Sequence, residues 1–360
     1  MKKSQFKQGI ITLALFLCAA TLTANAEELK KEFHREMVPT ETTTLTVNNK
    51  FGDVITETWA ENNIIIDVVV TVEHPSAEKA KKLLDMIDVK FTEADGNLTA
   101  ETLFNDDFSN THWGGDNNKF SIDYKVRMPA KINLTVDNKY GNSDIDMVAG
   151  LASLTVKYGN LTVHKLTRGN VKPLNNLAVA YGKATIGDVS WAEINSRYCG
   201  QFSIDKATAL LVDSKYSKLT IGEISSLVCE SKYDGYSVTK ANNIMMTSGY
   251  TNLNFGTVSK KVEVDTRYGN LTVDRVPEGF ESVSVKAAYC AVKLGIDPSA
   301  CYSLEAKSSY GNVKLDDSNF SPDKRIVGNT STELAGQVGK CSNPASKVEV
   351  SASYGSVKLY

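Results

Sequence analysis

The stretch Lys157-Tyr158-Gly159-Asn160-Leu161-Thr162-Val163 recurs in close copies along most of the chain. Each copy carries one aromatic residue, at Phe51, Tyr140, Tyr158, Tyr181, Tyr198, Tyr216, Tyr233, Tyr250, Tyr268, Tyr289, Tyr310 and Tyr354. Between Tyr181 and Tyr268, successive aromatic residues are 17 or 18 positions apart. A fixed period of this length is typical of repeat architectures.

Apolar and small residues alternate in the positions before each aromatic residue. Before Tyr216, Leu210 and Val212 stand six and four positions away, and Ser214 stands two positions away. This alternation predicts a strand with one buried face and places the tyrosine on that face. Replacing Tyr216 by Ala should then leave a core cavity that costs about 3–5 kcal/mol. The tyrosines expected in this inward structural ladder are Tyr158, Tyr181, Tyr198, Tyr216, Tyr233, Tyr250 and Tyr268.

The apolar phase breaks after each aromatic residue. Leu219 and Ile221 follow Tyr216 by three and five positions, which would put them on the opposite face of a straight strand. A corner at the Gly-Asn pair, which follows the aromatic residue in several copies, would restore the phase, because both residues tolerate positive φ. A chain that climbs one strand spacing per repeat also stacks like residues in register. The sequence therefore predicts an all-β fold, a parallel β-solenoid (β-helix) with about 17–18 residues per rung.

The first residues resemble a cleaved secretory signal peptide, which we expect to span residues 1–26. A basic start precedes an apolar run from Ile10 to Ala20 and the exit sequence Ala24-Asn25-Ala26. A retained membrane anchor is one alternative, although the run is short for a membrane span. Lipid attachment at Cys18 is another. We therefore expect an exported protein, in the periplasm or at the cell surface, with no transmembrane span in the mature chain.

Residues 27–130 are expected to form a β-rich region that caps the coil. Apolar residues at helical spacing predict a helix over residues 77–87 with Ser76 as its N-cap. This helix would hide the terminal edge of the solenoid. The strands expected in this region lie at about 64–72, 89–93, 97–104 and 119–128.

The solenoid repeats are expected to occupy residues 131–360. They should run without interruption as far as residue 316. Residues 316–346 are expected to lengthen one or two returns, with prolines and glycines among them. Val348 to Tyr360 should then add one more complete repeat at the end of the coil.

Charge and cysteine content restrict the class of partner. The full chain has a net charge of −2, and loss of the signal would leave 37 Lys and Arg against 42 Asp and Glu, a net charge of −5. This balance disfavours nucleic acid. Five cysteines follow the signal, so they cannot all pair with one another. They are expected to be small apolar fillers, with a Cys301–Cys341 bridge as the alternative for one pair. The five are Cys199, Cys229, Cys290, Cys301 and Cys341.

The outward positions supply the candidate binding residues. Basic residues stand directly before several aromatic residues, and acidic residues stand two positions earlier. These alternating charges are expected to form a solvated surface. In a second interpretation, Asp213 and Glu230 would lie about 5 Å apart, as the two carboxyl groups of a retaining glycosidase do. A polar loop adds a histidine and a tryptophan that either contact a ligand or belong to a solvated connector. The candidate surface-binding residues are Lys157, Arg197, Lys215, Lys232, Arg267, His112 and Trp113.

A second outward column lies four positions after the aromatic residues. It carries hydroxyl groups, as at Thr220 and Thr272, and becomes basic at Lys293, Lys314 and Lys358. Such a flat, regular ladder suits an extended partner, such as a glycan. The sequence contains no nucleotide-binding loop, catalytic triad order or metalloprotease motif. We therefore expect no catalytic residues, no metal and no cofactor.

The motif set resembles the putative-adhesin family of bacterial β-strand-repeat proteins, an exported domain of unknown function. The similarity covers nearly the whole chain after the signal, and its motifs are structural rather than catalytic. It therefore implies a fold and an exported setting, and no functional residues. The matching segments are Thr44-Leu45-Thr46-Val47-Asn48-Asn49-Lys50-Phe51-Gly52, Tyr124-Lys125-Val126-Arg127-Met128-Pro129-Ala130, the Tyr-Gly-Asn repeats, and Val348 to Leu359.

These patterns favour a non-enzymatic binding or scaffold protein of the cell envelope, adhesin-like, that contacts glycan or protein through flat solenoid faces. Two alternatives stay open. One is a polysaccharide-active enzyme on the same β-helix, and the other is an envelope-stress accessory that binds a membrane protein. Glycan binding without turnover, product release and a co-purified membrane protein would distinguish the three.

Overall fold

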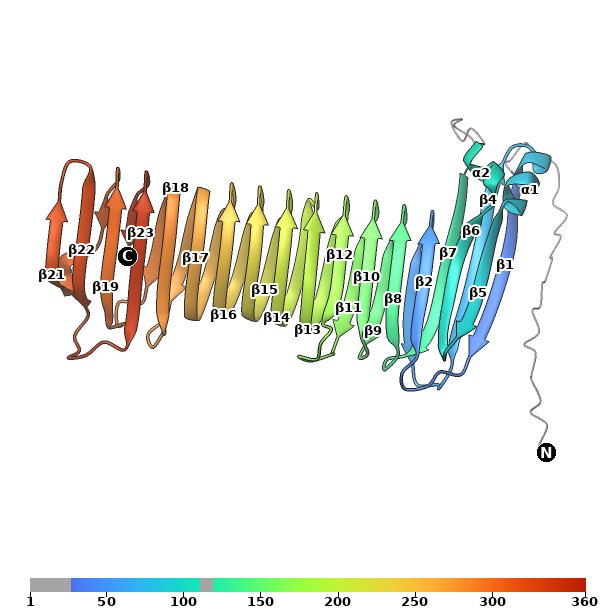
Figure 1. Cartoon of the computed structure of the whole chain (residues 1–360), viewed down its shortest axis with the longest axis horizontal. Helices are drawn as coiled ribbons and strands as arrows, with labels where there is room; N and C mark the ends of the chain where they lie inside the picture. The colour runs from blue at the N-terminus through green and yellow to red at the C-terminus, as the bar shows by residue number, and fades with distance from the viewer. Residues whose placement is uncertain (1–26, 111–118) are drawn as a thin grey trace. The chain divides into compact units, whose positions relative to one another are not determined.

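The computed structural model describes residues 27–110 and 119–360 (Figure 1). These residues form two compact units, one ending at Thr162 and the other beginning at Val163. Both units consist mainly of strands, so the prediction of an all-β fold is confirmed. The predicted signal peptide and the candidates His112 and Trp113 lie outside the described residues.

The unit that ends at Thr162 contains two rows of paired strands. Its strands are β1 (Glu27–Met37), β2 (Thr44–Lys50), β3 (Val54–Trp59), β4 (Ile64–His74), β5 (Ile87–Ala94), β6 (Asn97–Phe104), β7 (Lys119–Pro129), β8 (Asn133–Lys139), β9 (Ser143–Val148) and β10 (Ala152–Lys157). In one row, β2 runs parallel between β6 and β8, β10 continues parallel to β8, and β5 is antiparallel to β6. In the other row, β4 is antiparallel to both β1 and β7, and β3 runs parallel between β7 and β9.

The helix of this unit is shorter than the sequence indicates. Helix α1 (Ala77–Asp85) begins where expected, but Ser76 makes no side-chain capping hydrogen bond. Ile87, expected in the helix, begins β5 instead, where it pairs with Phe104 of β6. Strand pairing therefore outweighs the helical periodicity of this residue. Helix α1 packs against β4 and β1, and α2 (Asp106–Asn110) is a second, five-residue helix.

The unit that begins at Val163 is dominated by long parallel strands. Strand β11 (Leu161–Leu166) crosses the boundary between the units. It is followed by β12 (Asn175–Ala180), β13 (Lys183–Arg197), β14 (Gln201–Lys215), β15 (Lys218–Lys232), β16 (Gly235–Gly249), β17 (Asn252–Val276), β18 (Ser282–Ile296), β19 (Tyr302–Ser309), β20 (Val313–Lys314), the 3-10 turn η1 (Asp317–Asn319), β21 (Phe320–Val327), β22 (Ser331–Val338), β23 (Ser346–Ser353) and β24 (Val357–Leu359).

Consecutive strands from β12 to β18 pair in parallel, and each residue lies opposite its counterpart in the next repeat. Arg197 pairs with Lys215, and Lys215 pairs with Lys232, at the 18- and 17-residue steps that the sequence shows. Figure 1 shows β13 to β17 side by side in chain order. The inward positions are buried as expected, for example Val212 and Leu210 before the corner and Leu219 after it.

The aromatic residues lie on the outside, so the predicted inward position of the tyrosines is wrong. The tyrosines of the repeat are 46% to 61% exposed. Every aromatic residue of the repeat, from Phe51 to Tyr354, has a φ between 54° and 64°. The left-handed residue is therefore the aromatic residue itself, not the Gly-Asn pair. Its conformation turns two successive side chains outward, as with Lys215 and Tyr216, and this restores the apolar phase.

The outward rings form a stacked column in each unit. In the unit that begins at Val163, the column runs through Tyr181, Tyr198, Tyr216, Tyr233, Tyr250, Tyr268, Tyr289, Tyr354 and Tyr310. Neighbouring ring centroids are 4.7–4.9 Å apart, and the planes differ by 13° or less. In the other unit, Tyr140 stacks between Phe51 and Tyr158 at 5.1 and 5.0 Å. The expected stacking is confirmed for these pairs.

Glycine is required after several aromatic residues for a reason of space. A Cβ atom on Gly269 would lie 2.0 Å from the carbonyl oxygen of Thr251, in the neighbouring repeat. On Gly159 it would lie 1.8 Å from the carbonyl oxygen of Gly141. Neither glycine has a positive φ. These residues therefore permit close approach of two corners, and they do not supply the left-handed turn.

The last strands are not added in sequence order. Strand β23 runs parallel between β18 and β19 (Figure 1). Strand β24 pairs with both β18 and β20. Residues 316–346 are more than lengthened returns, because they contain the antiparallel pair β21–β22, and β22 is antiparallel to β19. A disulfide joins Cys301 to Cys341, and Cys199, Cys229 and Cys290 are free and buried. A second interruption is the loop between β11 and β12, where the repeat was expected to continue.

Candidate functional site

The outer face of β13 to β17 carries regular columns of side chains just before the corners. Parallel register places Asp213 opposite Glu230 and Lys215 opposite Lys232. Four of the predicted binding residues, Arg197, Lys215, Lys232 and Arg267, lie on this face next to the tyrosine column. The structure therefore gathers these four residues into one surface, as the repeat predicts.

Arg197 is more engaged than the other three. Its Nη2 donates to Asp213 Oδ2 at 2.6 Å, and its Nη1 donates to the Asp213 carbonyl oxygen at 2.8 Å. This contact joins neighbouring strands and gives Asp213 a fixed counter-charge. Lys215 and Asp213, two positions apart on β14, form no ion pair within 4.0 Å, whereas the equivalent pair Lys139 and Asp137 on β8 lies 3.9 Å apart. Asp213 is thus an acceptor for an arginine, which does not suit a catalytic acid.

The charge columns are interrupted at β16. Thr247 lies between Glu230 and Asp265, and Gly249 lies between Lys232 and Arg267. Both charges of the repeat are therefore missing on one strand. The result is a hollow of about 510 Å³, here called the Thr247 hollow. Its lining includes Glu230, Lys232, Thr247, Gly249, Asp265, Arg267 and the tyrosines Tyr233, Tyr250 and Tyr268.

The Thr247 hollow offers hydrogen-bond donors and acceptors close together. The cationic groups of Lys232 and Arg267 are donors, and the carboxylates of Glu230 and Asp265 are acceptors. The flanking residues are two strand spacings apart, about 10 Å at the usual spacing. The tyrosine rings cover one another's faces by stacking, so a ligand meets their edges and hydroxyl groups.

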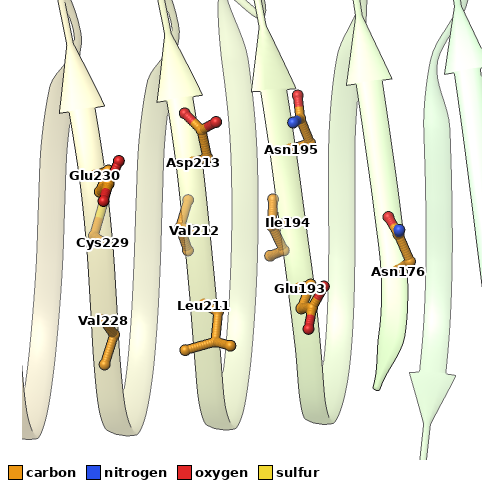
Figure 2. A pocket seen from close by; sticks show the side chains of 10 residues that line it. All are labelled: Asn176, Glu193, Ile194, Asn195, Leu211, Val212, Asp213, Val228, Cys229 and Glu230. Carbon is orange, nitrogen blue, oxygen red and sulfur yellow. The ribbon is translucent and has the colours of Figure 1, made fainter. Parts of the chain in front are cut away.

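An apolar strip lies next to this surface and is not predicted by the alternation. Leu211, Val228 and Met245 are opposite one another and are 45%, 40% and 45% exposed. Figure 2 shows Leu211 and Val228 beside Glu193, below a polar row that contains Asp213 and Glu230. These residues line a hollow of about 390 Å³. Sequence reasoning missed this strip, although three consecutive apolar residues mark it in each strand: 210–212, 227–229 and 244–246.

A buried polar cluster lies beneath the corners of β14 to β16. Asp234 occupies the position of the repeat's glycine and is 8% exposed. Its carboxylate accepts hydrogen bonds from Ser214 Oγ and Ser231 Oγ, both at 2.7 Å, and from the Ser217 backbone N at 2.6 Å. Tyr236 OH lies 2.6 Å from Ser214 Oγ. Because each group is hydrogen-bonded, the cluster fixes the corners rather than presenting free chemistry.

One further predicted binding residue among the described ones is Lys157. Lys157 is exposed beside Tyr158 in the unit that ends at Thr162. His34 contacts Asp67, with 2.6 Å between Nδ1 and Oδ1. Within residues 27–110 and 119–360, no three His, Cys, Asp or Glu residues are arranged to hold a metal ion. In the same ranges, no helix is both long and apolar enough to cross a membrane.

Comparisons with known proteins gave similarities at the level of structure alone. No protein-family model matches the sequence, and no curated protein matches it. The structure resembles a putative cell adhesion protein from Clostridium sporogenes (11% identity, 92% of this chain and 99% of that chain, TM-score 0.20). It also resembles a putative adhesin from Bacteroides fragilis (11%, 92% and 97%, 0.27) and a putative lipid binding protein from Parabacteroides distasonis (8%, 91% and 96%, 0.34). At these identities and TM-scores, none of the three transfers a function to this chain.

Proposed function

We propose that this chain is an exported, non-enzymatic binding or scaffold protein of the cell envelope, adhesin-like in kind, which binds glycan on the outer face of a parallel β-solenoid. The solenoid is supported by the in-register parallel pairing of β12 to β18 at steps of one repeat. A chain that returns to the same register within 17 or 18 residues winds in one sense. In this arrangement residues 27–130, with α1, cap the coil, and residues 131–360 form the repeats.

The Thr247 hollow is the main structural support for a binding function. Here a strand that lacks both charges of the repeat lies between two strands that carry both, and the volume of about 510 Å³ lies in the range usual for small-ligand sites. A sugar presents hydroxyl groups that both donate and accept hydrogen bonds. Glu230, Lys232, Asp265 and Arg267 supply both kinds of partner around the hollow. A neutral oligosaccharide therefore fits this site best.

The sharpest test restores the interrupted pattern. Thr247→Glu with Gly249→Lys would give β16 the same charges as β15 and would fill the hollow. Gly249 has an ordinary φ, and no atom lies within 4 Å of an added Cβ, so the strand should accept the change. We expect the double variant to bind neutral glycans about tenfold more weakly than the native protein, in array screening followed by calorimetric titration.

A matched control makes the same chemical change elsewhere. Asn254→Glu with Gly200→Lys adds one acid and one base at exposed positions outside the hollow, and Gly200 also has open space at its Cβ. This variant should bind like the native protein. Equal binding by the filled variant, or no glycan binding by the native protein, would contradict the assignment of the hollow.

The same preparations distinguish the proposal from an enzyme. A binding protein releases no new reducing ends from the glycan that it retains, whereas a polysaccharide-cleaving enzyme does. Turnover that disappears in Asp213→Asn would therefore replace this proposal with the glycosidase interpretation. Accessibility labelling of intact producing cells, together with release of the periplasmic contents, tests export. A protein that is absent from the periplasmic fraction and becomes labelled only when the cells are lysed would contradict it.

A further inference from the structure

A second outward column differs from the charged surface just described. It lies on the strands after the corners, where parallel register aligns one outward residue per repeat. From β13 to β17 this column is uncharged. At β18 it becomes basic, because Thr272 lies opposite Lys293. The uncharged members are Thr185, Ser203, Thr220, Ser237, Asn254 and Thr272.

Three lysines continue this column on three neighbouring strands. Lys293 of β18 lies opposite Lys358 of β24, and Lys358 lies opposite Lys314 of β20. The order differs from the sequence, because the inserted strand β24 places Lys358 between the other two. All three side chains are exposed. These residues are called the lysine column below.

The lysine column has no counter-charge of its own. Among the described residues, no carboxylate lies within 4.0 Å of any of the three ammonium groups. Other lysines of the same unit are paired, for example Lys307 and Lys324 with Glu333, and Lys347 with Glu349. Like charges opposite each other on neighbouring strands destabilise a sheet. An anionic partner would remove this repulsion. A surface that served only solubility would instead alternate positive and negative charges and would have no such repulsion.

The surroundings of the column suit a sugar chain. The Lys358 ammonium lies 5.2 Å from the centre of the Tyr360 ring, and that ring covers Gly295, whose added Cβ would meet Tyr360 Cε2 at 3.3 Å. Asn312 and Ser356 are exposed directly before β20 and β24, two residues before Lys314 and Lys358. Amide and hydroxyl groups beside cations match a ligand that carries both hydroxyl groups and negative charges.

We propose that the lysine column is a binding site for an extended acidic polysaccharide, which lies across β18, β24 and β20 with its anionic groups against the three ammonium groups. Nucleic acid fits less well, since the chain has a net charge of −2 and the tyrosine faces that bases would stack on are covered by one another. The site lies on strands other than those of the Thr247 hollow. It therefore stands whether or not the hollow binds a neutral glycan.

The test uses polygalacturonate as the probe and a triple variant, Lys293→Ser with Lys314→Ser and Lys358→Ser. Serine restores the hydroxyl character that the column has elsewhere. We expect the native protein to bind the polymer at low salt, and the triple variant to bind about tenfold or more weakly. The dependence of log Kd on log salt should also become shallower by about two to three, one contact per lysine.

The control removes the same charge from other exposed positions: Lys206→Ser, Lys218→Ser and Lys260→Ser. It should keep native affinity. The Lys→Arg triple variant of the column should also bind, since it keeps the charges. If the Lys→Ser triple variant does not fold, Lys358→Gln alone, at the centre of the column, should still weaken binding several-fold. Equal loss in the two serine triples, or equally tight binding of single-stranded DNA, would overturn the proposal, as would no binding of polygalacturonate by the native protein.

Discussion

Each repeat of this protein turns at an aromatic residue, a tyrosine in every case but Phe51, that holds a left-handed conformation. Tyr216 has a φ of 55°, and a residue with a Cβ pays about 1–2 kcal/mol for such a conformation. Two ring contacts and one backbone hydrogen bond offset this cost. The ring stacks on Tyr198 and Tyr233, both at 4.9 Å, and the backbone N donates to the carbonyl oxygen of Lys232 at 3.1 Å. The aromatic ring therefore stabilises the corner through its neighbours in the column rather than through burial.

In a strand a Gly variant is usually less stable than the Ala variant, and we expect the opposite order at position 216. Tyr216→Ala loses two ring contacts and keeps the backbone strain, so we expect it to lower the free energy of unfolding by about 1–3 kcal/mol. Tyr216→Gly loses the same contacts but relieves the strain, and it should be about 1 kcal/mol more stable than Tyr216→Ala. Urea denaturation of both variants measures the difference.

The adjacent residue provides the control for that comparison. Lys215 is also exposed but has ordinary strand geometry, so Lys215→Gly should be less stable than Lys215→Ala by about 0.5–1 kcal/mol. The sign of the Gly–Ala difference must therefore change between positions 215 and 216. Greater stability of the Ala variant at position 216 would show that the left-handed tyrosine is not the source of strain.

The sequence pattern places the corner at the residues after the tyrosine, whereas the structure places it at the tyrosine itself. Period-2 alternation identifies the inward residues correctly up to Ser214, but it cannot tell which residue absorbs the change of phase. Tyr216 is bulky and apolar in part, and Gly and Asn are the usual left-handed residues, so both signals favoured the wrong position. The space around Gly269, occupied by the Thr251 carbonyl oxygen, is visible only when neighbouring repeats are in place.

At the scale of elements, the repeat period determines the pairing of β12 to β18 but not the order of the final strands. Val348 to Leu359 has the same motif as other repeats, so sequence order alone predicts that it follows β19 and β20. The structure instead places β23 and β24 between β18 and the pair β19–β20. Strand β22 covers the far side of β19, and β21 bears the exposed residues Pro322, Lys324 and Arg325 at that edge. Proline and charge are typical protection for an unpaired edge.

The disulfide should hold this rearranged end together. Cys301 and Cys341 are 40 residues apart in the sequence, and closing a loop of that length should contribute about 4 kcal/mol at most by restricting the unfolded chain. In Cys301→Ser/Cys341→Ser we expect faster hydrogen exchange in β19, β21 and β22. Mass spectrometry of peptide fragments can follow the exchange.

Strands β14 to β17 provide an internal reference for that experiment. They pair in parallel with the neighbouring repeats, and neither cysteine of the bridge belongs to these strands or to a strand paired with them, so their exchange should stay at the native rate. Cys199→Ala, which removes a buried free thiol, serves as a control for the loss of a cysteine side chain. Uniform acceleration over all strands would mean that the bridge stabilises the whole unit rather than its end.

At the scale of the whole molecule, the sequence predicted the all-β class and the parallel register but only part of the candidate surface. Arg197, Lys215, Lys232 and Arg267 are fixed by the period, so their assembly on one face follows directly. The Thr247 hollow arises because β16 lacks the acidic and the basic residue of the repeat. A search for conspicuous side chains overlooks such a gap. The lysine column depends on the insertion of β24, a topological fact that no local motif contains.

The buried cluster should make the free energy of unfolding of its whole unit depend on pH. Burial raises the pKa of the Cys229 thiol from 9.0 to about 12, and it raises the pKa of the Tyr236 hydroxyl well above 10.0. Above pH 9 the unfolded chain loses these protons first, so the folded state binds more protons than the unfolded state. The free energy of unfolding must then fall as the pH rises from about 9 to 12, by up to about 1.4 kcal/mol per pH unit for each group. The stabilising effect of the neutral groups is complete below pH 9.

Tyr236→Phe should make that decline less steep, because it removes one of the titrating groups. The variant also loses the hydrogen bond with Ser214, so it should be less stable than the native protein at pH 7 while the gap narrows toward pH 11. Phe255→Leu, a change at another fully buried position that removes no titrating group, should lower stability equally at every pH. Urea midpoints of the unit from Val163 to Tyr360, measured between pH 7 and 11 within the full chain, give the slopes. Parallel curves for the native protein and Tyr236→Phe would mean that the phenol ionises as readily in the folded state as in the unfolded one, and the buried cluster would then be open to water.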